Sequence, residues 1–426
     1  MRIVSIILAA LMVMVSSAFA DNYVYQVGSM SATGTGTGTI TQNDANWADV
    51  TGDGNIVEQY NYKDAWHDAN GGSITQTLTN GAQVNGEGNF VQQWNDGYAY
   101  TDSSAVNAVI TQTDSNLAFV GQNYYSYGND VYQWNHEEAD IIGSTDQTIA
   151  QDLANIGTVD GDENTLNQNT NWAKAVSDYD YMSTISQSQT SLGTIDGWYN
   201  YMEQNNDAYA NTYSSDFGSV DQAQTNIGQQ YGDWNILSQL NDADANSYYG
   251  YDNNGDGFGN VVDQDQVNVA QMSWYGADNG VTQYNYANAD QTYGGWDETS
   301  IQSQSNFADT YDIYNTATQN NYAYSDMNGN GGDFVIQTQG NLANIYDWTW
   351  NGVADQLNYA YAQTDAQYYD DSDVITQTEN NIAEITGYWD PVESAYQTNY
   401  VNAVQGFDTS VDITQTATNM AQINGP

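Results

Sequence analysis

Oxygen-bearing side chains between residues 252 and 263 have the spacing of a calcium-binding loop. The stretch DNNGDG begins at Asp252, and Asp263 follows eleven residues later, which fits the pattern D-x-N-x-D-G-x₅-D. Closely spaced carboxylate and amide oxygens suit Ca²⁺. The candidate ligands are Asp252, Asn254, Asp256 and Asp263. Chance is the competing interpretation, because the chain is rich in Asp, Asn and Gly and the flanking segments read as strands rather than helices.

Catalytic groups are scarce in this sequence. It has no cysteine and two histidines, His67 and His136, which we interpret as exposed loop or strand residues rather than bases. Carboxylate pairs occur throughout so acidic a chain, so their presence says nothing about glycoside hydrolysis. We therefore expect no enzyme, no catalytic residues and no cofactor other than Ca²⁺ bound by acidic loops.

The charge balance excludes whole classes of partner. The chain carries 54 acidic residues and a formal net charge of −51, and its basic residues are Arg2, Lys63 and Lys174. Phosphate binding needs clustered Lys and Arg, so nucleic acid and anionic membrane surfaces are excluded. Such chains repel one another until cations screen them.

The first twenty residues have the pattern of a secretory signal peptide. Arg2 precedes the apolar run IVSIILAALMVMV, and small residues ending at Ala20 complete a cleavage site. The mature chain is expected to begin at Asp21 and to be secreted, extracellular or at the cell surface. No later stretch has the length of a membrane span. Residues 21–39 are expected to form a Gly/Thr-rich arm that is a flexible tether, a secretion signal or a donated strand.

One eleven-residue phrase, I-x-Q-x-x-x-N-x-A-x-V, recurs eleven times from residue 40 to residue 423, and we call it the first unit. Its Gln is present in every copy: Gln42, Gln76, Gln112, Gln151, Gln187, Gln222, Gln264, Gln302, Gln337, Gln377 and Gln415. Its Asn is replaced once, by Ser191, and is otherwise Asn46, Asn80, Asn116, Asn155, Asn226, Asn268, Asn306, Asn341, Asn381 and Asn419.

A second phrase, Q-x-N-x-A-x-A, lies between successive first units. It is clearest in QYNYANA (283–289) and QLNYAYA (356–362), and it occurs ten times. The combined period is about 37 residues, which is typical of a solenoid, propeller or array.

The held positions within each unit are an even number of residues apart, which is the period of a β-strand. The sequence predicts an all-β solenoid over residues 40–426. Buried amides are costly unless they are hydrogen-bonded, but identical strands stacked in register let each Gln and Asn bond the same residue in neighbouring rungs. Ala and Gly then let two sheets approach closely. Lys63 and Glu137 break the pattern at inward positions.

Residues such as ITQTDSNLAFV (110–120) and ITQTENNIAEI (375–385) resemble curlin repeats, the units of the curli major subunit and related extracellular functional amyloids. Amyloid-like sheath proteins are a looser relative. The resemblance implies a strand ending in Gln, a short arch and a second strand opening with N-x-A. It also implies that Gln112, Asn116, Gln377 and Asn381 are inward ladder residues of a solenoid that polymerises end to end.

Two architectures fit the period. Each period is either one flattened rung of two long strands or a pair of β-arch rungs. Eleven rungs at ~4.8 Å would give a stack of about 53 Å, and twenty-one would give roughly 100 Å.

The variable face of the second unit is often aromatic. We expect a surface stripe that includes Tyr284, Tyr286, Tyr322, Tyr324, Tyr359 and Tyr361. Such rings either stack as ladders that stabilise the solenoid or bind neighbouring fibres and surfaces.

These features predict a secreted structural subunit that assembles with itself into an amyloid-like filament, sheath or biofilm matrix fibre. Further partners would be secretion or nucleation factors and neighbouring fibres. The main alternative is a monomeric solenoid adhesin. Ice binding, suggested by Thr-x-Thr pairs such as Thr75/Thr77, and carbohydrate activity are weaker alternatives.

Overall fold

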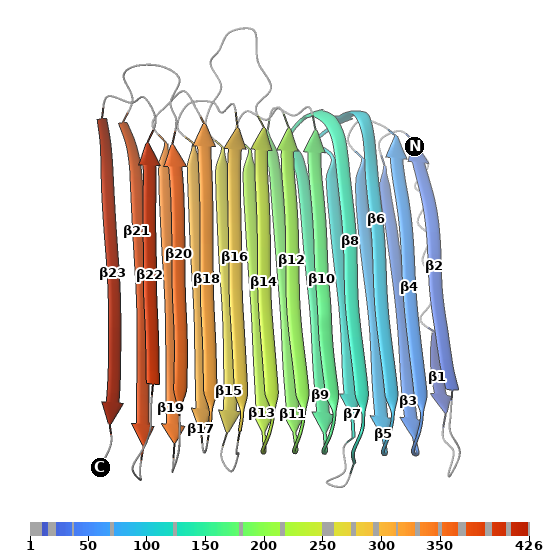
Figure 1. The fold of residues 1–426 in the computed structure, drawn as a ribbon. Coiled ribbons are helices and arrows are strands. Elements are labelled where there is room, and N and C mark those ends of the chain that lie inside the picture. The colour runs from blue at the N-terminus through green and yellow to red at the C-terminus, as the bar shows by residue number, and fades with distance from the viewer. Residues whose placement is uncertain are drawn as a thin grey trace.

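The computed structural model shows a stack of two parallel β-sheets (Figure 1). It describes residues 11–15 and 23–424, apart from segments 36–37, 69–71, 122–125, 179–181, 214–217, 249–259, 274–277, 293–297, 312–313, 329–332, 348–351, 365–371, 388–393 and 406–409. Within these residues all regular structure is strand. No helix long and apolar enough to span a bilayer occurs in them.

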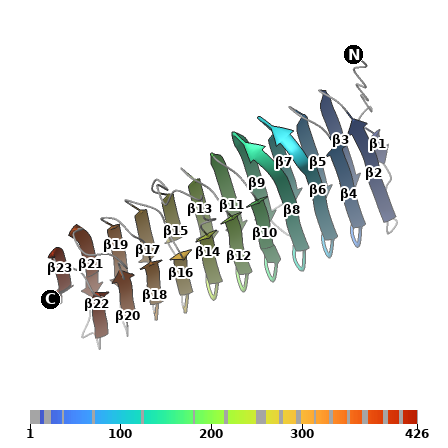
Figure 2. The same ribbon diagram turned by 90° about the horizontal axis from the view of Figure 1, so that it is seen from above.

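The odd-numbered strands form one sheet of 12 strands and the even-numbered strands a second sheet of 11 (Figure 2). The odd sheet comprises β1 (Leu11–Val15), β3 (Thr39–Thr51), β5 (Ser73–Asn85), β7 (Val109–Val120), β9 (Gln147–Asp160), β11 (Ser183–Asp196), β13 (Ser219–Tyr231), β15 (Val261–Ser273), β17 (Thr299–Tyr311), β19 (Phe334–Asp347), β21 (Ser372–Gly387) and β23 (Ser410–Asn424). The even sheet comprises β2 (Tyr23–Thr35), β4 (Ile56–Asp68), β6 (Phe90–Val106), β8 (Asp130–Thr145), β10 (Thr165–Asp178), β12 (Tyr201–Tyr213), β14 (Ile236–Tyr248), β16 (Gly280–Thr292), β18 (Thr316–Asn328), β20 (Val353–Thr364) and β22 (Ser394–Gln405).

Each period forms one flattened rung with one strand in each sheet, so the first of the two expected architectures is the one observed. The arch implied by the curlin resemblance does not occur. Gln112 and Asn116 both lie in β7, whose residues alternate between buried and half-buried from Ile110 to Val120. The inward face continues unbroken between the amides, so nothing in the sequence turns the chain there.

The solenoid also extends further toward the N-terminus than residue 40. Strand β2 pairs in parallel with β4 and buries Val24, Gln26 and Met30, which are an even number of residues apart. The segment expected to be an arm therefore supplies the first strand of the even sheet. Strand β1, which lies within the expected signal peptide, pairs with β3 over five residues.

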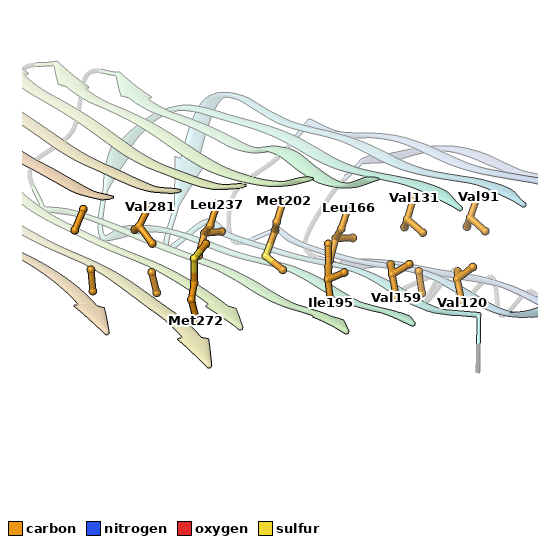
Figure 3. Close-up of a cluster of buried hydrophobic side chains, with 14 of the residues drawn as sticks. Val91, Val120, Val131, Val159, Leu166, Ile195, Met202, Leu237, Met272 and Val281 are labelled. Carbon is orange, nitrogen blue, oxygen red and sulfur yellow. The ribbon is translucent and has the colours of Figure 1, made fainter. Parts of the chain in front are cut away.

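Apolar clusters lie on both sides of the amides along the strands. In one of them two rows of side chains face each other (Figure 3). Within a rung, a small residue on one sheet faces a large residue on the other. A Cβ added to Gly157 would lie 2.5 Å from Leu166, and one added to Gly228 would lie 2.7 Å from Leu237. The Gly positions therefore make room for the largest partners on the opposite sheet, because a close-packed interior tolerates no extra methyl group there.

Turns between the odd and even strands end in a buried Asn ladder that the sequence analysis missed. The backbone N–H of Asn55 donates to Asn89 Oδ1 at 3.0 Å, and the same bond links Asn89 to Asn129 and Asn129 to Asn164. The residue before each Asn has a left-handed backbone: Gly54 (φ 67°), Gly88 (φ 63°), Gly128 (φ 68°), Glu163 (φ 55°), Tyr199 (φ 60°), Trp234 (φ 54°), Asp278 (φ 58°) and Tyr314 (φ 59°). Five of these eight positions lack glycine, so the turn was hard to recognise from sequence.

Candidate assembly site: the amide core and the open ends

The first-unit glutamines form a continuous ladder along the odd sheet, as predicted. Gln76 Nε2 donates to Gln42 Oε1 at 2.9 Å and to the main-chain oxygen of Tyr98, in the even sheet, at 3.0 Å. The rung-to-rung bond repeats to the end of the stack, where Gln415 donates to Gln377 at 2.8 Å. Each carboxamide thus satisfies both neighbours along the sheet and one carbonyl opposite, which removes the cost of burying it.

The first-unit asparagines form a second ladder that joins the two sheets. Asn80 Nδ2 donates to Oδ1 of Asn95 in the even sheet at 2.9 Å and of Asn116 in the next odd strand at 3.1 Å. Ser191 occupies the Asn position in β11. Its hydroxyl accepts from Asn171 and donates to Asn206, both at 3.2 Å, so the bridge between the sheets persists at this rung. Asn155, in the preceding odd strand, donates to the main-chain oxygen of Gln133 at 3.4 Å.

Further ladders lie outside the first-unit positions. The even sheet has its own Gln ladder, in which Gln59 donates to Gln26 at 2.7 Å, and its asparagines complete the bridge between sheets, as Asn61 does by donating to Asn80 at 3.0 Å. A third ladder starts at β11, where Gln224 donates to Gln189 at 2.7 Å, and its members are Gln189, Gln224, Gln266, Gln304 and Gln339. We missed it because Asp44, Leu78, Asp114 and Leu153 occupy the same position in earlier rungs.

The early rungs instead contain a buried charged cluster. Lys63, Asp114 and Glu137 are at most 1% exposed, and Lys63 Nζ donates to the main-chain oxygen of Gln42 at 2.9 Å. Burial lowers the pKa of Lys63 to about 8 and raises the pKa of Asp114 to about 8. Burial and the neighbouring Asp114 also raise the pKa of Glu137. Lys63 and Glu137 thus lie at inward positions, as predicted.

A carboxyl group also ends the third ladder near the C-terminus. Glu379 is fully buried and pairs in register with Gln339. Burial raises the pKa of Glu379 to about 8. Gln339 Oε1 is buried and accepts no hydrogen bond from the described residues, so a protonated Glu379 in the next rung has the position to donate where a Gln would.

The ladders have a direction, which makes the two ends of the stack complementary. Gln ladders donate toward the N-terminal end, so Oε1 of the last members, Gln397 and Gln415, faces the open C-terminal end. The Asn ladder of the odd sheet donates the opposite way, since Asn46 donates to Asn80 and Asn381 to Asn419. A following rung with the same residues would therefore continue both.

The predicted aromatic stripe lies on the outer face of the even sheet. Tyr324 and Tyr361 stack with ring centroids 4.9 Å apart and planes 4° apart. Tyr359 lies 6.2 Å from Tyr322. The face of each stacked ring is covered by its neighbour, so in these rungs the rings favour a ladder that stabilises the solenoid over a surface that binds other fibres. Tyr284 and Tyr286 are 37% and 42% exposed.

The structure describes only some of the remaining candidate residues. Asp263 lies half-buried on the outer face of β15, and Asp252, Asn254 and Asp256 fall outside the described residues. No group of three or more potential metal ligands occurs among the residues described. His67 is buried, contrary to expectation, because it continues the inward alternation of β4. His136 lies on the outer face and contacts Asp96 at 2.7 Å.

Comparisons with protein-family profiles, curated proteins and solved structures found no match. The case for function therefore rests on the chain's own geometry.

Proposed function

We propose that this protein is a secreted, non-catalytic structural subunit that assembles end to end into an amyloid-like extracellular filament, sheath or biofilm matrix fibre. The observation that carries the proposal is the exposed edge formed by β22 and β23. Both strands keep the inward residues of the repeat, and no other described strand covers them, so Ile413 and Ile423 are 45% and 49% exposed.

A second copy is the occupant that fits this end. Removal of the expected signal peptide would take β1 away and leave β3 as the edge of the odd sheet, beside β2. Gln42 Nε2 of one copy could then donate to Gln415 Oε1 of another, and Asn419 could donate to Asn46. Stacking would also bury Ile413 and Ile423 and pair the free backbone groups of both edges, which an isolated edge strand leaves as a liability.

The net negative charge of the chain makes assembly depend on the cations in solution. At a net charge of −51 the copies repel each other, so cations or high salt are needed to bring the ends together. Ca²⁺ bound by acidic loops is one source of this screening.

Two matched substitutions in β23 test the proposal. Ala421 faces inward at the open end and Gln422 faces outward on the same strand, so A421E and Q422E add the same charge to opposite faces. We expect A421E to stay monomeric, because stacking would bury its carboxylate, and Q422E to form filaments under negative-stain microscopy. Filaments from both variants would sink the end-to-end proposal. Monodisperse wild-type particles with and without Ca²⁺ would favour the monomeric adhesin.

A further inference from the structure

Tyrosines occupy matching positions at the two ends of the even sheet. Tyr25 on β2 and Tyr396 on β22 each precede a ladder glutamine, Gln26 and Gln397 respectively. Strand pairing places both in one outward-facing row. They are 58% and 62% exposed, which makes them among the most accessible rings of the described chain.

End-to-end assembly, on which this inference rests, would bring these two rings together. If the Gln ladder continues across the junction, Gln26 of the following copy pairs with Gln397 of the preceding copy. The parallel register then pairs Tyr25 of the following copy with Tyr396 of the preceding copy. Aromatic residues paired in register within the chain show the resulting geometry. Tyr359 and Tyr400 have ring centroids 4.9 Å apart, and Trp94 and Trp134 lie 5.6 Å apart.

We propose that Tyr25 and Tyr396 of adjoining copies form an oxidative cross-linking site that locks each junction with a dityrosine bond. Each phenol loses one hydrogen atom, as a proton and an electron, to give a phenoxyl radical. The two radicals join through ring carbons ortho to the oxygens, and the displaced ring hydrogens move to the oxygens and restore both phenols. The oxidant is hydrogen peroxide activated by a haem peroxidase, and it takes up the two hydrogen atoms to give two water molecules.

Position separates this pair from other close tyrosines. Tyr324 and Tyr361 belong to one chain, so a bond between them joins no copies. Tyr23, beside Tyr25, pairs with Ile56 on one side, and the same register across the junction would place it on Ser394 rather than on a tyrosine. The junction therefore offers one directly paired tyrosine couple on this face.

Isotope mixing tests the assignment. Equal amounts of ¹⁴N- and ¹⁵N-labelled chains are assembled, treated with hydrogen peroxide and horseradish peroxidase, and analysed by denaturing gel and peptide mass spectrometry. We expect covalent oligomers and a linked peptide that contains Tyr25 from one isotope and Tyr396 from the other. Y25F and Y396F should each abolish this peptide, whereas Y132F, a tyrosine of the same row in mid-stack, should leave it unchanged.

Microscopy of the same samples separates the two proposals. Filaments that yield no mixed-isotope Tyr25–Tyr396 peptide, or only links through other tyrosines, would overturn the cross-linking site and leave the polymer proposal standing. Failure to form filaments would overturn both. Circular dichroism of Y25F and Y396F checks that each variant keeps its strands.

Discussion

Asn80 bonds Asn95 across the sheets and Asn116 along its own sheet, through one amide nitrogen at 2.9 and 3.1 Å. This forked contact recurs along the stack and ties both sheets into one network. The buried amides of each central rung therefore depend on the neighbouring rungs for their hydrogen bonds, so the core is stable only when the strands stay in register.

Replacing one central asparagine should be costly, and serine should recover part of the loss. Asn226 donates to Asn241 and Asn268, so N226A leaves both oxygens without that donor. We expect a loss of about 1–3 kcal/mol in unfolding free energy. N226S should lose less, because Ser191 serves in this position in β11. Chemical denaturation measures both, and equal losses would contradict the role of the bridge.

Size compensation in the apolar core gives a rescue experiment. G228A places a methyl group 2.7 Å from Leu237, and we expect overpacking to cost about 1–3 kcal/mol. Adding L237V should restore most of the stability, because the next rung has this combination of residues. Val281 stands at the position of Leu237, and Ala270 stands at the position of Gly228. A double variant no more stable than G228A would show that the two positions are not coupled.

Glu379 should make stability depend on pH. Its folded pKa is about 8, above the ordinary value of 4.5, so the folded state holds the proton more tightly. Stability is then full below about pH 4.5 and falls as pH rises toward 8. E379Q, which continues the Gln ladder, should lessen this fall in melting temperature by the part that Glu379 contributes, because Asp114 and Glu137 also have raised pKa values in the folded state. E384Q, on the outer face of β21, should leave the fall unchanged. An unchanged profile for E379Q would place the effect elsewhere.

The buried charged cluster should behave as a unit. K63A alone leaves buried carboxyl groups without their cation, and we expect a loss of about 3–5 kcal/mol. The triple variant K63A/D114Q/E137A introduces the residue types found at Ala208 and Gln224 in later rungs, and it should equal or exceed the wild type in stability. Urea unfolding of both variants distinguishes this from simple additivity, in which the triple variant would be the least stable.

The strands and their inward amides were predictable from the sequence. The repeated Gln and Asn are an even number of residues apart, and in a strand such residues must share one face. Gln112 and Asn116 lie where that spacing puts them. Other features depended on partners far along the chain. The Gln189 ladder was hidden because Asp and Leu hold its position in earlier rungs, and β2 was missed because its Gly/Thr-rich sequence hides Val24 and Gln26. His67 was expected to be an exposed loop or strand residue, and its burial depends on β4 extending as far as Asp68.

The mass per length of filaments, measured by scanning transmission electron microscopy, tests the end-to-end account most directly. The 11 rungs of the even sheet at ~4.8 Å predict one chain for every ~53 Å of each single stack. A value of one chain, or a whole multiple of one, per ~53 Å is the expected result. A value between whole multiples would contradict a stack in which each copy continues the rungs of the last.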